Sequence, residues 1–262
     1  MTAIEHNLIS ARFRRSMDTY DEAAQVQKGV GDCLVAEIAK YPEITFGRVL
    51  EIGCCTGSMT RTFCNRHTVD ELWLNDLVPE CCERAALRVE SMVGRVHTLP
   101  GDIESLLLPA GCDLVISSST FQWLHHLKSC LAKISETLLD GGHLVFSMFG
   151  PGTMRQVKEL TGMGLRYTAE KELEDMLKEK FHILNLMSTS YRIYFDTSRE
   201  VLRHIQRTGV GGAGSLRWTT GRLRQFEKEY RVRFGEEQGL PLDYVSISAV
   251  VKKKAGAFRY AG

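Results

Sequence analysis

Apolar residues recur with a helical spacing in the first part of the chain and form short continuous runs in the middle part. Between residues 8 and 40, apolar positions three or four residues apart predict one or two amphipathic helices. From residue 47 to residue 149, short apolar runs alternate with helical or mixed segments. This alternation is typical of βαβ units, and it predicts an α/β fold whose parallel sheet carries helices on both faces.

The pattern changes after Phe149, where a Gly-Pro-Gly sequence interrupts it. Helical spacing then predicts helices over 153–162, 169–180, 198–208 and 219–233, and alternation predicts strands over 188–196 and 244–253. We therefore divide the chain into three parts. They are a helical cap over 1–42, a cofactor-binding α/β core over 43–150, and lid helices with the last two strands of the same domain over 151–262.

A glycine-rich turn follows the first apolar run. The segment VLEIGCCTGSMT (49–60) places an acid, Glu51, at the end of a strand, and Gly53 and Gly57 in the turn before a helix. Glycine lets the main chain approach a ligand closely, and a helix N-terminus offers free N–H groups. In a doubly wound sheet this turn lies at the carboxyl edge of the first strand, where ligands bind.

Two further acids follow the next two predicted strands. Asp76 ends the second strand, where a carboxylate holds a ribose diol in nucleotide-binding folds. Asp102 and Ile103 follow the third strand, where they suit the amine and the ring face of a base. Each Asp alone also suits a helix N-cap. Three acids at three successive strand ends, together with the glycine turn, predict a nucleoside-containing cofactor.

The spacing of the turn separates two classes of cofactor. A dinucleotide site needs G-x-G-x-x-G, which is absent here and argues against a nicotinamide dehydrogenase. The arrangement Glu51-x-Gly53-x-Cys55-x-Gly57 resembles motif I of class I S-adenosylmethionine-dependent methyltransferases, with Cys55 in place of the middle glycine. This resemblance implies S-adenosyl-L-methionine as the cofactor.

The resemblance extends over most of the chain. The segments ARFRRSMDTYDEAAQVQ (11–27), GDIESL to GPGT (101–153), VLRHIQRTGVGG (201–212) and LPLDYVSISAV (240–250) are similar to the BioC family of biotin-pathway malonyl-[acyl-carrier protein] O-methyltransferases. The sequence departs from the family at Gln206, where a lysine is frequent, and at Asp243, where a threonine is frequent. The resemblance implies a Rossmann-like class I methyltransferase fold. That fold has a seven-stranded, mostly parallel sheet with an antiparallel last strand, helices on both faces and a helical lid.

The same resemblance implies a reaction, which is methylation of the free carboxylate of malonyl-acyl carrier protein at an early step toward biotin. A carboxylate is ionised near neutral pH, so no general base is needed. Positioning and desolvation then supply the rate, and we expect neither a catalytic dyad nor a metal. We interpret His125 and His126 as solvent-facing or structural residues.

We expect the cofactor to contact strand-end and turn residues together with one residue of the first helices, Gln27, which would reach its methionine end. The set is Gln27, Glu51, Gly53, Cys54, Gly57, Asp76, Leu77, Asp102, Ile103 and Ser117. Tyr20 and Gln122 are candidate positioning residues, and Tyr20 would orient the substrate carboxylate or close the site. A packed core tyrosine is an equally open interpretation of Tyr20, and Trp123 fits the core better than a ligand.

Charge is balanced over the whole chain but not along it. The sequence has 33 basic and 32 acidic residues, so no global field predicts binding to nucleic acid or a membrane. The stretch 199–233, however, holds nine basic residues against three acidic ones. Acyl carrier proteins are acidic, so a basic face would steer them. We expect docking on Arg199, Arg203 and Arg207, which share one helix face, and on Arg222 and Arg224.

Other interpretations stay open at this stage. Another small carboxylate or a quinone-type compound fits as the acceptor, a nucleic acid fits as the target of a basic face, and a non-catalytic scaffold is a further alternative. Eight cysteines without zinc spacing predict free thiols and a reducing cytoplasm. The N-terminus lacks the apolar core of a secretory signal. The sequence does not indicate an oligomeric state.

Overall fold

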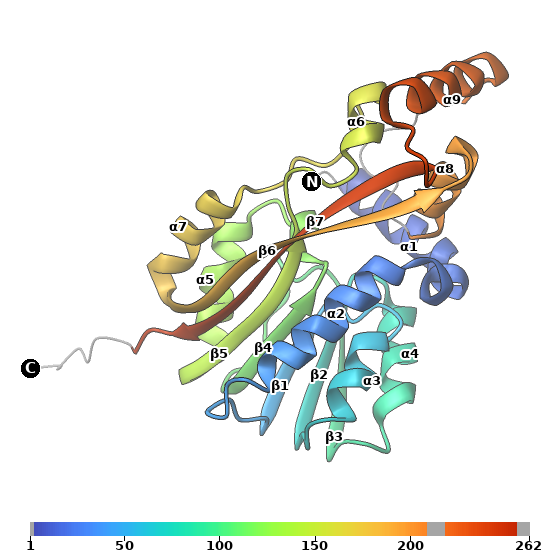
Figure 1. Cartoon of the computed structure of the whole chain (residues 1–262). Helices are drawn as coiled ribbons and strands as arrows, with labels where there is room; N and C mark the ends of the chain where they lie inside the picture. Colours follow the sequence, from blue (N-terminus) through green and yellow to red (C-terminus); the bar gives the residue numbers. More distant parts are fainter. Residues whose placement is uncertain (1–2, 209–217, 256–262) are drawn as a thin grey trace, which may run out of the picture.

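One seven-stranded sheet organises the molecule in this computed structural model, which describes residues 3–208 and 218–255 (Figure 1). The strand order is β3-β2-β1-β4-β5-β7-β6. The first five strands in this order, β3, β2, β1, β4 and β5, pair in parallel, and β7 runs antiparallel to both β5 and β6. The bounds are β1 Arg48–Ile52, β2 Glu71–Asp76, β3 Arg95–Pro100, β4 Cys112–Ser118, β5 Leu138–Phe149, β6 Phe181–Phe195 and β7 Leu240–Lys253. The predicted fold class is confirmed.

Helices cover both faces of this sheet (Figure 1). One face packs against α2 (Gln25–Ile38), α3 (Ser58–Cys64) and α4 (Pro79–Val89). The other face packs against α5 (Leu127–Thr137) and α7 (Glu170–Lys180). The central strands are buried on both sides, which explains why their sequences are continuous apolar runs.

A group of helices stands above the carboxyl ends of the strands. It contains α1 (Ala3–Ala23), α6 (Arg155–Thr161), α8 (Ser198–Arg207) and α9 (Thr220–Phe234), and a short 3-10 turn, η1 (Phe121–Trp123), follows β4 below it. A separate apolar cluster joins α6, α8 and α9 to the first half of β7, through residues such as Val201, Phe226, Tyr230 and Tyr244. The predicted N-terminal helical region is split at Ala24, where the ψ angle of 46° is not helical.

Three element boundaries differ from the sequence expectation. Strand β7 begins at Leu240 rather than at residue 244, because residues 240–243 pair with residues 192–195 of β6. The helical spacing after Leu127 continues to Leu139, yet α5 ends at Thr137 and Leu138 begins β5. Strand β6 starts at Phe181 rather than at residue 188, because residues 181–187 pair with the end of β7. In all three cases strand pairing with a distant segment decides the boundary, and local spacing does not contain that information.

Three ion pairs fix α1 against α4. They join Arg14 to Glu80 at 2.8 Å, Asp18 to Arg84 at 3.1 Å and Asp21 to Arg88 at 2.7 Å. The helix therefore roofs the edge at which β1 and β2 end (Figure 1). Within the described ranges, no helix is long and apolar enough to cross a membrane.

Candidate active site

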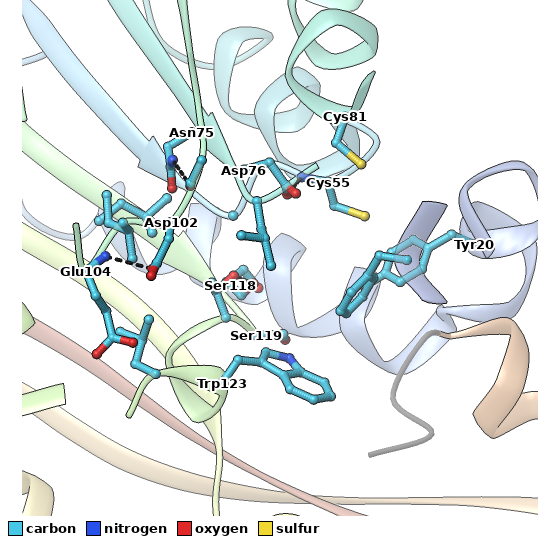
Figure 2. A pocket seen from close by; sticks show the side chains of 18 residues that line it. Tyr20, Cys55, Asn75, Asp76, Cys81, Asp102, Glu104, Ser118, Ser119 and Trp123 are labelled. Carbon is cyan, nitrogen blue, oxygen red and sulfur yellow. Dashed lines mark hydrogen bonds between the residues drawn. The ribbon is translucent and has the colours of Figure 1, made fainter. Parts of the chain in front are cut away.

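A cavity with about 830 Å³ of empty space opens where β1, β2 and β4 end (Figure 2). We call it the main cavity. A second hollow of about 550 Å³, the side cavity, shares Tyr20, Gly53, Cys55, Ser118 and Ser119 with it. Of the residues expected at the cofactor, Gly53, Asp76, Leu77, Asp102 and Ile103 line the main cavity. Gln27, Glu51, Gly53 and Cys54 line the side cavity.

The glycine-rich loop needs glycine at two positions. Gly53 has a φ of 75°, and a Cβ there would lie 2.0 Å from the Oγ1 of Thr120. Gly57 has a φ of 80° and begins α3 without lining either cavity, and its Cβ would lie 2.7 Å from the Cα of Ala85. Gly53 therefore lets the loop of residues 118–120 approach, whereas Gly57 lets α3 and α4 pack closely.

Asp76 holds the glycine-rich loop through its carboxylate. Its Oδ2 accepts the N–H of Cys55 at 2.9 Å, and its Oδ1 accepts the N–H of Val78 at 2.9 Å. Burial raises the pKa of Asp76 to about 6, against the lowering effect of these N–H groups. The carboxylate is thus ionised at neutral pH. It lines the main cavity beside Cys55 (Figure 2), and a carboxylate has more lone pairs than these two N–H groups use.

The side cavity contains buried polar atoms that lack a protein partner. Gln27 is 7% exposed, and neither its Nε2 nor its Oε1 has a hydrogen-bond partner in the described part of the chain. Glu51 is 1% exposed, and its Oε2 is also unpartnered there. Burial raises the pKa of Glu51 to about 8. Buried polar groups normally find partners, so these atoms indicate a polar ligand in the side cavity.

The loop after β3 is fixed from both sides. The Oδ1 of Asp102 accepts the N–H of Glu104 at 2.9 Å. The carboxylate of Glu104 in turn accepts the main-chain N–H groups of His125, at 3.2 Å, and His126, at 2.6 Å. Neither histidine lines either cavity. Sequence reasoning missed Glu104, which holds the loop of Asp102 against the start of α5.

Tyr20 lies at the junction of the two cavities and comes from the roof helix α1. Burial raises the pKa of Tyr20, and nearby Cys55 and Asp76 raise it further. Its hydroxyl therefore stays protonated and can donate a hydrogen bond. Phe13 packs edge-on against Trp123 at 5.7 Å and completes an aromatic wall of the main cavity. Trp123 thus lines the cavity, although its sequence favoured the core.

Ser117 and Gln122 act behind the cavity wall. The hydroxyl of Ser117 donates to the carbonyl of Ile52 at 2.8 Å and ties β4 to β1. Gln122 donates from Nε2 to the carbonyl of Ser119 and accepts the N–H of Phe149 at 3.1 Å. Neither residue lines a cavity, so any positioning by Gln122 is indirect.

The loop after β4 supplies hydroxyl groups that sequence reasoning did not select. Ser118, Ser119 and Thr120 line the main cavity, and Ser118 and Ser119 also line the side cavity. Ser119 has a left-handed φ of 54°, and its Oγ is buried without a partner among the described residues. The run of serines at the end of a buried strand was the feature of the sequence from which these hydroxyl groups could have been predicted. The strained backbone, held by Gln122, indicates a residue with a binding role.

Two cysteine pairs build the wall beside Tyr20. Side-chain hydrogen bonds join Cys55 to Cys81 and Cys54 to Cys82, and these bonds together with burial raise the thiol pKa values of Cys54 and Cys55. Figure 2 shows the sulfur atoms of Cys55 and Cys81 on the same side of the cavity. All eight cysteines are free, so this wall is apolar and uncharged.

The chemistry of the lining narrows what the main cavity can do. Its described lining includes no lysine, arginine or histidine, and hydroxyl groups stand between the carboxylates and the aromatic wall. No group of three histidine, cysteine, aspartate or glutamate side chains in the described ranges could hold a metal ion. The cavity therefore suits a nucleoside-containing ligand beside a small polar group.

The five arginines expected at a docking face lie on the lid. Arg199, Arg203 and Arg207 are exposed along one face of α8, and Arg222 and Arg224 are exposed on α9. Buried residues of α8, such as Val201 and Ile205, occupy its opposite face. The arrangement expected from the i, i+4, i+8 spacing is therefore present.

Comparison with known proteins identifies the family. Residues 50–146 match the model of the methyltransferase domain family. The malonyl-[acyl-carrier protein] O-methyltransferase of Chlorobium phaeovibrioides is 34% identical over 94% of this chain and 96% of its own length. The protein of the same name from Haemophilus ducreyi is 30% identical over 98% of this chain and 100% of its own.

Solved structures agree on the fold. A methyltransferase structure from Bacillus halodurans has a TM-score of 0.61 at 16% identity and covers 84% of this chain and 99% of its own. A sarcosine dimethylglycine methyltransferase structure from Galdieria sulphuraria has a TM-score of 0.57 at 10% identity and covers 86% and 85%. The sequence relatives, which match nearly the whole chain, decide the family: this chain belongs to the malonyl-[acyl-carrier protein] O-methyltransferases.

Proposed function

We propose that this protein transfers a methyl group from S-adenosyl-L-methionine to the free carboxylate of a malonyl thioester on acyl carrier protein. The observation that carries the proposal is full-length similarity to enzymes of that name, combined with a cavity at the strand ends whose described lining has no lysine, arginine or histidine. The product, a methyl ester, would enter the route to biotin. Eight free cysteines support a reducing, cytoplasmic location as part of the same proposal.

The residues present fit the cofactor. Asp76 offers an ionised carboxylate for a ribose diol, and Ile103 and Asp102 offer an apolar face and an acceptor for a base. The unpartnered atoms of Gln27 and Glu51 fit the amine and carboxylate of the methionine part. When bound, the cofactor supplies an electrophilic methyl group. Leu77 and Cys54 would add contacts along the same walls.

The acceptor would be held by neutral donors. A carboxylate and a sulfonium lose their opposite charges as methyl transfer proceeds, so a cation beside the carboxylate would stabilise the reactants more than the transition state. The hydroxyls of Tyr20 and Ser119 offer hydrogen bonds without that cost. The rings of Phe13 and Trp123 would exclude water from the reacting carboxylate. Tyr20 and Ser119 are thus proposed positioning residues.

The basic face would recruit the carrier. Helices α8 and α9, which carry the exposed arginines, stand at the same end of the sheet as the roof helix α1 (Figure 1). Clustered positive charge raises the association rate of an acidic partner and makes it sensitive to salt. This face favours a carrier-bound acid over a free small carboxylate or a quinone-type acceptor, because an array of arginines on two helices matches an acidic protein surface better than one small group.

Mass spectrometry of the carrier tests the proposal directly. Malonyl-acyl carrier protein incubated with the protein and S-adenosyl-L-methionine should gain one methyl group. Acetyl-acyl carrier protein, which lacks the free carboxylate, should gain none. Methylation of both carriers would place the acceptor elsewhere. Methylation of neither, with intact cofactor binding by calorimetry, would favour another acceptor or a scaffold and would end this proposal.

A further inference from the structure

The lid contains another hollow, which encloses about 890 Å³ of empty space and is partly open to solvent. We call it the lid hollow. Its lining comprises Pro151, Gly152, Thr153, Arg155, Lys158, Glu159, Arg166 and Tyr167. Three cations thus face one carboxylate, whereas the main cavity has no cation in its described lining. The lid hollow therefore has the electrostatic character of an anion site, and neither cavity at the strand ends shares it.

Only part of this positive charge is neutralised within the described ranges. Arg155 contacts Glu159 at 3.2 Å and Asp243 at 3.5 Å. Glu159 also pairs with Arg233 at 2.9 Å, so the one carboxylate of the lining is already shared by two arginines. Lys158 and Arg166 are exposed, and no carboxylate of the described chain forms an ion pair with either. Both remain available for an anionic ligand.

The walls add hydrogen-bond donors. Burial raises the pKa of Tyr167, so its hydroxyl stays protonated and can donate. Thr153 anchors the lining to β7, because its Oγ1 accepts the N–H of Val245 at 3.0 Å and donates to the carbonyl of that residue at 3.2 Å. The hydroxyl of Tyr167 therefore adds a neutral donor to a lining that is tied to the sheet.

The lid hollow is close to the main cavity. Pro151 and Thr153 follow Phe149 by two and four residues, so each Cα lies within roughly 7 to 14 Å of that of Phe149. The N–H of Phe149 bonds to Gln122, which also holds the loop of Ser119 in the main cavity wall. Phe149 and Gln122 therefore link the chain that lines the lid hollow to the wall of the main cavity.

The lid hollow is also close to the basic face. Helix α6, which carries Lys158, packs against α9, and the ion pair between Glu159 and Arg233 joins the two. Arg222 and Arg224 of the docking face lie on the same α9. Helix α9 therefore connects the lid hollow with part of the docking face. A carrier's prosthetic arm has a phosphodiester at its protein end and the acyl thioester at its far end.

We propose that Lys158 and Arg166 bind the phosphate group of the carrier's pantetheine arm in the lid hollow, while the malonyl end lies in the main cavity. This proposal rests on the proposed function. It assigns recognition of the arm to the lid, separately from recognition of the carrier protein by the α8 face. A nucleotide-linked thioester such as malonyl-CoA carries the same phosphate chemistry, so the test must separate the two sources.

The test compares malonyl-pantetheine, malonyl-4′-phosphopantetheine and malonyl-CoA as methyl acceptors. The wild-type protein should use the phosphorylated arm with a kcat/KM about tenfold higher than the unphosphorylated arm. The double variant Lys158→Gln/Arg166→Gln should reduce that ratio to below about threefold and leave turnover of malonyl-pantetheine unchanged. If the phosphate alone is recognised, the kcat/KM for malonyl-CoA should equal that for malonyl-4′-phosphopantetheine. A higher kcat/KM for malonyl-CoA that persists in the double variant would assign a separate site to the nucleotide.

The matched control is Arg95→Gln, which removes an exposed arginine at the amino end of β3 and should retain the full ratio. A wild-type ratio near one, or an unchanged ratio in the double variant, overturns the proposal. If no malonyl thioester is methylated, the proposed function fails instead. Calorimetry with free 4′-phosphopantetheine then decides this inference, because the wild-type protein should bind it and the double variant should bind it at least about tenfold more weakly.

Discussion

The main-chain N–H of Cys55 donates a hydrogen bond to the Oδ2 of Asp76 over 2.9 Å. This bond joins the glycine-rich loop after β1 to the end of β2, so the two sequence motifs form one structural unit. The second oxygen of Asp76 accepts the N–H of Val78 and fixes the start of α4. One carboxylate therefore shapes both loops that would enclose the ribose.

Replacing Asp76 with asparagine should weaken cofactor binding by at least about tenfold. An amide has one acceptor oxygen in place of two, so the N–H of Cys55 or of Val78 must lose its partner. Calorimetric titration with S-adenosylhomocysteine measures the change. Asp70→Asn, at the exposed residue just before β2, is the matched control and should bind normally. Equal affinity in both variants would remove Asp76 from the cofactor site.

Cofactor affinity should rise with pH because of Glu51. In the ligand-free protein the Glu51 carboxyl keeps its proton below about pH 8, since burial raises its pKa to about 8. A bound ammonium group favours the carboxylate, so binding lowers this pKa and releases a proton. Affinity should therefore increase from pH 6.5 to pH 8, by at most tenfold per unit.

Calorimetry in buffers of different ionisation enthalpy would count the released protons. The variant Glu51→Gln keeps the size of the side chain but cannot titrate, so its affinity should be lower and nearly independent of pH over this range. If the variant and the wild-type protein show the same pH slope, another group accounts for it and Glu51 does not face the amine.

Much of this site followed from the sequence because strand ends meet at one edge. Glu51, Asp76 and Asp102 each follow an apolar run, and a parallel sheet brings such residues together whatever the loops do. Ser119 and Glu104 were not predicted, because their roles do not follow from their position at a strand end. Their roles depend on a left-handed backbone and on contacts with residues about 20 positions away, which local spacing does not encode.

The departure at Asp243 has a similar explanation. Asp243 on β7 lies opposite Arg192 on β6 and accepts its Nε at 2.6 Å. The two residues are 51 positions apart, so the pair became visible only when the register of the strands was known. The cysteine in place of the middle glycine of the motif has a partial explanation of the same kind. The thiol of Cys55 forms a hydrogen bond with that of Cys81, which lies in the first turn of α4.

Removing the contacts that hold α1 against the glycine-rich loop and α4 should weaken cofactor binding without unfolding the core. Asp21 accepts hydrogen bonds from Thr56 in the glycine-rich loop and from Arg88 on α4. Partial burial raises the pKa of Asp21, but these two bonds give a net lowering. Their contribution is therefore fully present above the usual pKa of an aspartate and is lost as the pH falls through the lowered value.

The variant Asp21→Asn should raise the KM for S-adenosyl-L-methionine several-fold at pH 7, and it should increase protease cleavage within α1. The control is Asp18→Asn, whose partner Arg84 lies on the same interface but whose carboxylate does not reach the glycine-rich loop. A KM unchanged by Asp21→Asn would mean that α1 does not close the site. Circular dichroism would show whether either variant disturbs the fold.

Removing single hydroxyls should lower turnover more than substrate affinity. The hydroxyls of Tyr20 and Ser119 are proposed to orient the acceptor carboxylate, and misorientation affects the transfer step itself. Tyr20→Phe and Ser119→Ala should each reduce kcat with malonyl-acyl carrier protein by roughly tenfold to a hundredfold. Binding of S-adenosylhomocysteine should change little. Ser105→Ala, an exposed hydroxyl outside both cavities, is the control. Unchanged kcat in both test variants would refute this role.

Reversing charge on the α8 face should impair use of the carrier but not of a carrier-free thioester. The triple variant Arg199→Glu/Arg203→Glu/Arg207→Glu should raise the KM for malonyl-acyl carrier protein at least about tenfold, because it replaces attraction to an acidic partner with repulsion. The wild-type KM should increase with ionic strength, and the variant's should not.

The KM for malonyl-CoA separates docking from a general loss of activity, and it should stay within about twofold in the α8 variant. The matched control, Arg61→Glu/Arg66→Glu/Arg95→Glu, changes the net charge by the same amount on a different surface. These three exposed residues lie on α3, in the segment after α3 and at the start of β3. If the control raises the carrier KM as much as the α8 variant does, net charge is responsible. Only a selective effect of the α8 variant assigns docking to that face.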